Sequence, residues 1–261
     1  MPFANHPDTT NIYYETYGEG TPILFVHPPA MGHVTFKEQR PLAQHFQMIT
    51  VDLRGNGRSD NQAEKITMKL IVEDLKAVVD AVGVEKVVLC GYSNGGSIAQ
   101  EFALTYPERA LGVILCGGFS EVTSFLLRNE FRLGIYAAQF KLMRLMSFAL
   151  ATAHTRSKLF QMELEDYVKK TDPKVLRNMY NEGLHYVSTD RLDQLTVPLL
   201  LVYGEKDHYV HHYQDIFLDK VKTDVDIVYI SGVKHQVPTK KSMELNRIIY
   251  NFVKRKVEKA S

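Results

Sequence analysis

The sequence predicts an α/β protein whose mostly parallel central sheet is flanked by helices and carries one helical insertion. Three observations support this fold class. Six short, continuously apolar runs recur along the chain, helix-like segments separate most of them, and residues 119–190 contain helix-like sequence alone. Runs that stay apolar, rather than alternating with polar residues, are typical of strands covered on both faces. The runs are residues 22–27, 47–52, 86–90, 111–116, 198–203 and 226–230.

The remaining elements follow in chain order. Residues 11–17 alternate between apolar and polar side chains and end at Gly18, which predicts an antiparallel edge strand. Residues 67–82 carry apolar side chains at helical spacing, and Gly83 is placed to end that helix. Further helices are expected over residues 97–105 and 242–256.

The insertion is rich in Met, Leu and Phe. We therefore expect a core of residues 1–118 and 191–261 that is interrupted by a helical cap of residues 119–190. Met and Phe adapt to irregular surfaces, so some of these residues should line a pocket, although most should pack the cap helices on the core. The candidates are Phe125, Phe131, Phe140, Met143, Met146, Phe148, Met162 and Met179.

Composition excludes several classes of protein. With 261 residues, 45% hydrophobic and 23% charged, the chain can bury one large core, which argues against a disordered or fibrous protein. Lys and Arg number 31 against 30 Asp and Glu, so a nucleic-acid partner is not expected. The chain has no recognisable secretion leader and no run of about 18 apolar residues. A cytoplasmic protein without a membrane partner is the expectation.

The sharpest local signal is Gly91-Tyr-Ser-Asn-Gly95, directly after the apolar run 86–90 and before a helix. A serine in such a strand-to-helix turn has a strained backbone, and small residues two positions before and after it let strand and helix approach each other. Ser93 is therefore the candidate nucleophile. Because a serine hydroxyl is a poor nucleophile at neutral pH, this hypothesis requires a histidine base and a carboxylate that orients it.

Both partners are expected later in the chain, with the acid first. Asp207 follows the run 198–203 in a turn at the carboxyl end of a strand, where sites on open α/β sheets are built. Glu205 is the next candidate. His235 is the one histidine in a loop after the last expected strand, and it precedes the terminal helix. These positions predict Asp207 as the acid and His235 as the base.

In these motifs the chain resembles the serine-hydrolase branch of the α/β-hydrolase fold family. The resemblance rests on the serine motif, on 51–60 (Val-Asp-Leu-Arg-Gly-Asn-Gly-Arg-Ser-Asp), on 203–207 (Tyr-Gly-Glu-Lys-Asp) and on 235–238 (His-Gln-Val-Pro), in the family's order. It implies that Ser93 is the nucleophile, His235 the general base and acid, and Asp207 the orienting carboxylate. It also implies that the insertion roofs the pocket. Dehalogenases and epoxide hydrolases of this fold have an aspartate where Ser93 stands.

The resemblance also implies an oxyanion hole, whose first donor is the backbone N–H of Asn94. The family's second donor comes from a loop usually written His-Gly-x, whereas this chain has His27-Pro-Pro-Ala-Met-Gly32. Because proline has no N–H, Pro29 cannot donate. We expect the N–H of Ala30 to substitute, with Met31 or a hole with one strong donor as the alternatives.

Other conspicuous residues are expected to be structural. His27 should tie neighbouring loops together through its ring nitrogens, and Arg54 should anchor nearby carbonyls or carboxylates. Cys90 and Cys116 each end an apolar run and should be buried. A cluster of three histidines lacks acidic or thiolate partners at metal-ligand spacing, so no metal site is expected. The histidines are His208, His211 and His212.

The sequence therefore predicts a cofactor-free serine hydrolase that forms an acyl-enzyme on Ser93 and cleaves a small or medium apolar carboxylic ester or a related acyl substrate. Hydrolysis of a thioester, a lactone or a carbon–carbon bond uses the same scaffold and stays an alternative. So does a different class, a regulator or ligand receptor that retains the triad and acts through a protein partner.

Overall fold

The computed structural model describes residues 3–259, which form one eight-stranded sheet of order β1-β2-β4-β3-β5-β6-β7-β8. All pairings from β4 to β8 are parallel, while β1–β2 and β2–β4 are antiparallel. All six apolar runs are therefore confirmed as strands of a mostly parallel sheet. The strands are β1 (Phe3–Asn5), β2 (Asn11–Tyr17), β3 (Pro22–Val26), β4 (Gln47–Val51), β5 (Val87–Tyr92), β6 (Ala110–Cys116), β7 (Leu199–Gly204) and β8 (Val225–Ile230).

The edge of the sheet differs from the expectation. Strand β2 is antiparallel as predicted, but β1 pairs outside it, with Ala4 opposite Ile12. The prediction that residues 11–17 form the edge strand is therefore wrong. A strand of three residues is too short to give a readable alternation of apolar and polar side chains, so β1 left no signal in the sequence.

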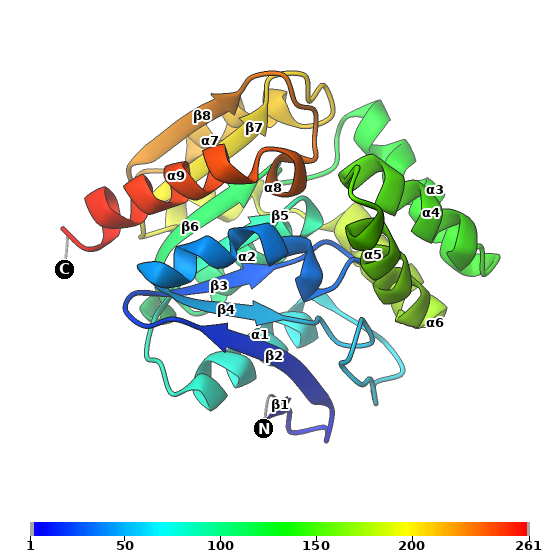
Figure 1. Ribbon diagram of the computed structural model, residues 1–261. Coiled ribbons are helices and arrows are strands. Elements are labelled where there is room, and N and C mark those ends of the chain that lie inside the picture. The colour runs from blue at the N-terminus through cyan, green and yellow to red at the C-terminus, as the bar shows by residue number, and fades with distance from the viewer. Residues whose placement is uncertain (1–2, 260–261) are drawn as a thin grey trace.

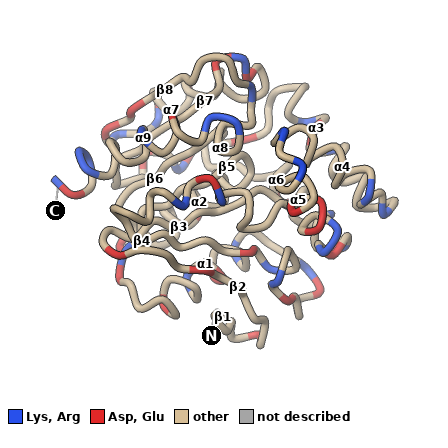
Figure 2. The backbone as a smooth tube through the Cα atoms, viewed as in Figure 1, with Lys and Arg blue, Asp and Glu red and all other residues tan. Residues whose placement is uncertain are grey.

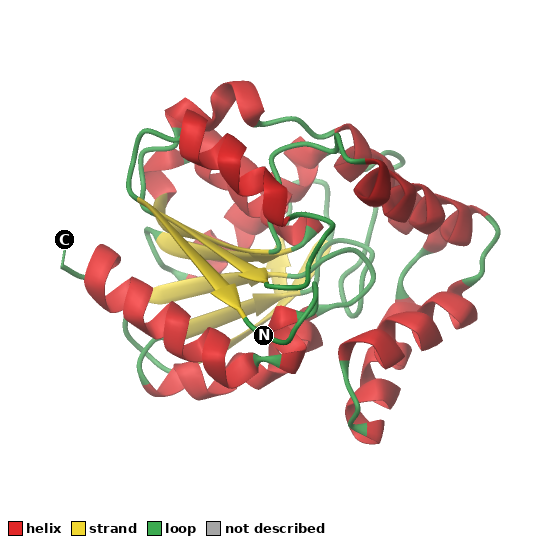
Figure 3. Ribbon diagram, turned by 90° about the horizontal axis from the view of Figure 1, so that it is seen from above, coloured by secondary structure: helices red, strands yellow, loops and turns green. Residues whose placement is uncertain are grey.

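The strands separate two apolar cores, one on each face of the sheet. In β3, Leu24 and Val26 pack into the core formed with α1 (Met68–Val82), α2 (Asn94–Thr105) and α7 (Gln214–Lys220). Ile23 and Phe25 pack into the other core, with the 3₁₀ segment His33–Gln44 and α9 (Ser242–Phe252). Figure 3 shows helices on both faces of the sheet. This explains why the strands are continuously apolar rather than alternating.

The helix ends agree with the local sequence. The Thr67 side chain accepts a hydrogen bond from the Leu70 N–H at 3.2 Å and caps the start of α1. Gly83 ends this helix with a φ of 79°, a left-handed conformation that favours glycine. At the other end of the chain, α9 continues as a π-helix over Val253–Val257. No helix within residues 3–259 has the length and apolar character needed to cross a membrane.

Four helices lie between β6 and β7: α3 (Phe125–Gln139), α4 (Met143–His154), α5 (Lys158–Lys170) and α6 (Pro173–His185). They form the helical segment, which sits beyond the ends of the parallel strands β3 to β8, on the side to which their arrowheads point (Figures 1 and 3). An isolated bridge pairs Glu121 with Val187, so the segment leaves and rejoins the rest of the chain at one place. The segment thus covers the carboxyl edge of the parallel sheet.

The expectation for the Met and Phe residues of the helical segment is met only in part. Phe131, Met143 and Met179 are buried. Four others point to solvent, with exposed fractions of 76% (Phe125), 64% (Phe140), 60% (Phe148) and 68% (Met162). Those four lie on the exposed surface of the helical segment and do not pack its helices on the core.

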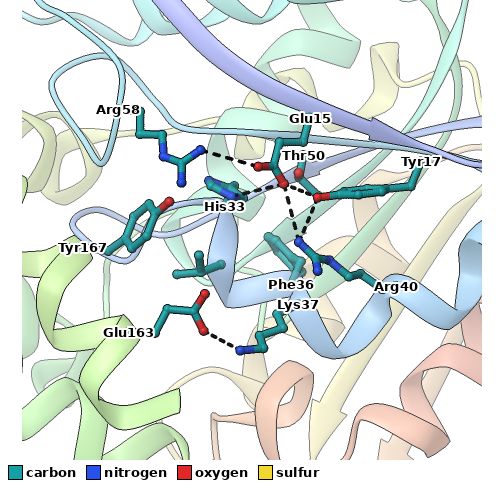
Figure 4. Close-up of a pocket in the computed structure, with 11 residues that line it drawn as sticks. Glu15, Tyr17, His33, Phe36, Lys37, Arg40, Thr50, Arg58, Glu163 and Tyr167 are labelled. Atoms are coloured by element: carbon teal, nitrogen blue, oxygen red, sulfur yellow. Dashed lines mark hydrogen bonds and ion pairs between the residues drawn. The ribbon is translucent and has the colours of Figure 1, made fainter. Parts of the chain in front are cut away.

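A small polar pocket of about 90 Å³ lies where the helical segment meets the sheet (Figure 4). Lys37 of the 3₁₀ segment pairs with Glu163 of α5 at 2.5 Å. Glu15 of β2 lies 3.6 Å from Arg40 and 3.7 Å from Arg58. These charges satisfy one another, which indicates a structural contact between α5 and the core.

The turn at residues 52–58 is held by a buried ion pair. The Arg54 side chain is fully buried and donates to both carboxylate oxygens of Asp74 in α1, at 2.7 and 2.6 Å. It also donates to Asp8 at 2.9 Å. The prediction that Arg54 anchors nearby carboxylates is confirmed.

Candidate active site

Ser93 occupies a sharp turn between β5 and α2. Its backbone has a φ of 52° and a ψ of −125°, a strained conformation for a residue with a side chain. Glycines make this turn sterically feasible. A Cβ on Gly91 would lie 2.4 Å from the Gly95 carbonyl oxygen, and one on Gly95 would lie 2.2 Å from the Val26 carbonyl oxygen. The local geometry is that of the predicted strand-to-helix elbow.

Gly95→Ala is expected to destabilise the protein by about 2 kcal/mol or more, because its methyl group would meet the fixed backbone of β3. Gly96→Ala is the matched control. A Cβ on Gly96 would lie 3.4 Å from its nearest neighbour, a methyl of Leu115, so this change should be neutral or stabilise α2 by about 0.5–1 kcal/mol. Urea unfolding measures both, and equal stability of the two variants would contradict the close approach.

His235 and Asp207 meet as predicted. Asp207 follows β7 and is fully buried, and its Oδ2 lies 2.6 Å from Nδ1 of His235. The other oxygen, Oδ1, accepts a hydrogen bond from the Tyr209 N–H at 3.2 Å. Glu205, the alternative acid, is exposed and instead accepts a hydrogen bond from the Gly232 N–H at 3.3 Å. Of the two candidate carboxylates, Asp207 is the one in contact with the imidazole.

The second ring nitrogen of His235 is open. Nε2 is buried and has no hydrogen-bond partner within the described residues, while His235 and Ser93 line the same pocket. Burial lowers the pKa of His235, but the hydrogen bond and charge of Asp207, assisted by Glu130, outweigh it and raise the pKa above 6.5. Asp207 therefore fixes the orientation of the imidazole through Nδ1, while Nε2 is able to exchange a proton.

Gly117 is a supporting residue that sequence analysis missed. It directly follows β6 with a φ of 63°, and a Cβ there would lie 2.6 Å from Cε1 of His235. Because glycine has no side chain, the imidazole of His235 can occupy this space. The pair Gly117-Gly118 after an apolar run was the available signal, since paired glycines at a strand end often mark a close approach.

The pocket at Ser93 is small, with a volume of about 60 Å³. Because one water molecule needs about 15 Å³ of such volume, the pocket has room for roughly four water molecules. Most of its wall is apolar, including Leu127, Phe131 and Leu150. The polar groups that line it, besides Ser93 and His235, include Glu130, His154 and Tyr180.

In the loop expected to complete the oxyanion hole, the candidate N–H donors already donate hydrogen bonds to other acceptors. Asn94 is the first residue of α2, so its N–H has no acceptor within the helix and is free to donate. The Ala30 N–H, however, donates to Oδ1 of Asn56 at 2.8 Å, and the Met31 N–H donates to the Pro28 carbonyl oxygen at 3.3 Å. The prediction that Ala30 supplies the second donor is therefore wrong for this conformation, because a side chain from the neighbouring turn engages its N–H.

His27 fixes the same loop, as predicted. Its Nε2 accepts a hydrogen bond from the Leu53 N–H at 2.9 Å. Burial lowers the pKa of His27 to about 4, so the ring is neutral at pH 7. The remaining proton then sits on Nδ1, which lies 2.7 Å from the Pro28 carbonyl oxygen. His27 is therefore a structural tie between two loops.

No group of three His, Cys, Asp or Glu side chains within residues 3–259 is arranged to hold a metal ion. The rings of His208 and His211 are 5.7 Å apart, and those of His211 and His212 are 6.3 Å apart. Cys90 and Cys116 are both buried free thiols.

Comparisons with known proteins identify the family and the fold. A family model described as alpha/beta hydrolase fold matches residues 21–235. A pimeloyl-[acyl-carrier protein] methyl ester esterase from Nitrosospira multiformis is 27% identical over 248 residues, covering 86% of this chain and 91% of that protein. Epoxide hydrolase 4 from Mus musculus is 26% identical over 272 residues, covering 93% and 76% respectively. The solved structure of an esterase from Exiguobacterium antarcticum has a TM-score of 0.86 at 20% identity, covering 97% and 98%.

Proposed function

Because this chain belongs to the alpha/beta hydrolase fold family and is a hydrolase, we propose that it is a serine hydrolase that cleaves a short-chain acyl ester or thioester through an acyl-enzyme on Ser93. One observation carries this proposal. The buried Asp207–His235 pair leaves Nε2 open in the pocket that contains Ser93 at its strained turn. A serine in this position argues against an epoxide-hydrolase mechanism, which the fold performs with an aspartate.

The proposed reaction has two steps. Ser93 Oγ attacks the acyl carbon while His235 Nε2 accepts its proton, and collapse of the tetrahedral intermediate breaks the bond to the leaving group, which takes that proton from His235. Water then repeats the sequence: His235 removes one proton, the hydroxide attacks the acyl carbon, and the bond to Ser93 Oγ breaks as the proton returns. Asp207 holds the Nδ1 proton and stabilises the imidazolium in both steps.

The oxyanion hole in this proposal relies mainly on the N–H of Asn94. Loss of one donor from a two-donor hole commonly lowers the rate by about 10²–10³. We therefore infer a slow hydrolase that favours activated acyl substrates. The small pocket supports short acyl groups, and the helical segment of residues 119–190 acts as the cap that excludes water above the core of residues 1–118 and 191–261.

The arrangement of Ser93, His235 and Asp207 is also compatible with one alternative function. A regulator or receptor with this fold would use the triad to hold a ligand rather than turn it over, and the engaged N–H groups of Ala30 and Met31 favour it. Turnover of p-nitrophenyl acetate and fluorophosphonate labelling of the purified protein distinguish the two. Labelling at Ser93 that disappears in His235→Ala, with many turnovers per site, supports the hydrolase. A burst of one product per site supports the receptor, and no labelling of folded protein contradicts an activated serine.

Glu130→Gln is expected to move the acidic limb of the kcat/KM profile to lower pH. His235 must be neutral at Nε2 to accept a proton, so activity falls as the pH drops through its pKa. The charge of Glu130 helps to raise that pKa, and its removal should lower it. The measurement is kcat/KM for p-nitrophenyl acetate against pH, with Glu165→Gln on α5 as control. An unmoved limb, or one at higher pH, would refute the coupling.

A further inference from the structure

A basic groove of about 670 Å³ adjoins the pocket of Ser93. Residues 154–157, from the end of α4 to the start of α5, form one part of it, and seven residues between 232 and 241, from the loop after β8 to the residue after α8 (Val237–Lys240), form another. Lys206, next to the candidate acid, completes it. His154 lines both the groove and the Ser93 pocket, so the two share a wall.

Positive charge dominates this groove. No Asp or Glu of the described residues lines it, whereas five cationic residues do. These are Arg156, Lys206, Lys234, Lys240 and Lys241. Lys241 pairs with Glu244 at 2.9 Å, whereas the other four are exposed and have no ion-pair partner in the part of the chain described. Figure 2 shows basic residues at α8, beside the helical segment. The whole chain carries a formal charge of only +1, so this excess is local.

An anion bound in the groove would relieve the mutual repulsion of these cations. The Ser93 pocket has the opposite character. Glu130 lines it, and no cationic side chain of Lys or Arg among residues 3–259 does. A carboxylate or phosphate on the acyl group would therefore meet a like charge, whereas the same group placed in the groove would meet four cations that have no ion-pair partner within residues 3–259.

The position of His235 indicates that the groove binds the alcohol or thiol half of the substrate. His235 gives its proton to the leaving group, so the leaving group must lie on the histidine side of the acyl carbon. Lys234 and Gln236, the sequence neighbours of His235, both line the groove. The groove therefore extends from the side on which the alcohol or thiol departs.

We propose that the substrate is an ester or thioester whose alcohol or thiol half carries a carboxylate or phosphate, which binds in the basic groove while a short uncharged acyl group enters the Ser93 pocket. This inference rests on the proposed function. The acyl–oxygen or acyl–sulfur bond breaks, the acyl group transfers to Ser93 Oγ, and the anionic alcohol or thiol leaves with the proton from His235.

Two matched pairs of substrates test it. 4-Acetoxybenzoate and 4-acetoxybenzamide differ by one carboxylate on the leaving group, and acetyl coenzyme A and S-acetyl-N-acetylcysteamine differ by the phosphate-bearing part of the thiol. We expect kcat/KM to favour the anionic member of at least one pair by on the order of tenfold. The preference should shrink at about 1 M salt, where the Debye length is about 3 Å. A preference within the first pair identifies a carboxylate, and one within the second a phosphate.

Charge-removing variants locate the effect. The double variant Arg156→Gln/Lys240→Gln should lose most of the preference ratio. Lys65→Gln/Lys86→Gln, which removes two exposed and unpaired lysines elsewhere in residues 3–259, should keep it. Equal kcat/KM within both pairs, or equal ratios in the two double variants, would overturn the inference and leave the proposed function standing.

If no ester is hydrolysed at all, the proposed function fails and binding still tests the groove. Calorimetric titration of coenzyme A and of 4-hydroxybenzoate into Ser93→Ala should show binding of at least one, weakened in the background of Arg156→Gln/Lys240→Gln. Absence of binding by both, or binding insensitive to that double variant, refutes the groove as an anion site.

Discussion

Ser93→Ala and His235→Ala are each expected to lower kcat for p-nitrophenyl acetate by a factor of about 10⁴ or more, because the triad acts as a unit and neither member works without the other. Neither change should unfold the protein. Ser97→Ala is the matched control: Ser97 lies one turn along α2, and its buried hydroxyl has no hydrogen-bond partner within the described residues. Its activity should equal that of the native protein. Activity retained in Ser93→Ala would place the nucleophile elsewhere.

Asp207→Asn completes this test and is expected to lower the rate by about 10⁴ as well. The amide can donate a hydrogen bond to Nδ1, which favours the tautomer with its proton on Nε2. That tautomer cannot accept the serine proton. Glu205→Gln should remain active, because Glu205 contacts the Gly232 N–H instead of the imidazole. The reverse result would assign the acid to Glu205.

Arg54→Ala is expected to destabilise the protein by about 3–5 kcal/mol, because it leaves the buried Asp74 carboxylate without its partner. Total stability is commonly about 5–15 kcal/mol, so the change removes a large share of it. Urea unfolding measures the effect. Arg40→Ala serves as control, since Arg40 is half-exposed, lies 3.6 Å from Glu15 and should contribute less than about 1 kcal/mol.

A second variant keeps this prediction testable if Arg54→Ala does not fold. Arg54→Met/Asp74→Leu removes both buried charges and should be more stable than Arg54→Ala alone, because well-packed apolar side chains can replace a buried ion pair. Asp8 has about a third of its side chain exposed and keeps contact with water. Equal loss of stability in the single and the double variants would show that packing, rather than the unpaired carboxylate, explains the effect.

Most of the fold could be predicted from the sequence because its strands are buried on both faces, which leaves uninterrupted apolar runs. The elbow at Ser93 was predictable for a similar reason: a steric demand at Gly91 and Gly95 has a direct signature in residue type. The positions of Asp207 and His235 followed from strand order. Their contact at 2.6 Å agrees with that reasoning.

What could not be predicted depends on contacts between distant segments. The Ala30 N–H is engaged by Asn56, whose side-chain direction no local pattern reveals. The basic groove likewise joins Arg156, Lys206 and Lys240, which are spread over the second half of the chain. The net charge of the whole chain conceals this local concentration, because acidic residues elsewhere balance it.

The bridge between Glu121 and Val187 has a consequence for how proteins of this kind can diversify. Since the two ends of the helical segment are adjacent, an insertion of different length or sequence could replace it without moving β6 or β7. The residues held by the sheet and its loops, Ser93, Asp207 and His235, would stay in place. Residues of the helical segment, such as Glu130 and Arg156, would change with the replacement. Transplanting this segment between relatives should therefore exchange substrate preference while conserving the chemistry.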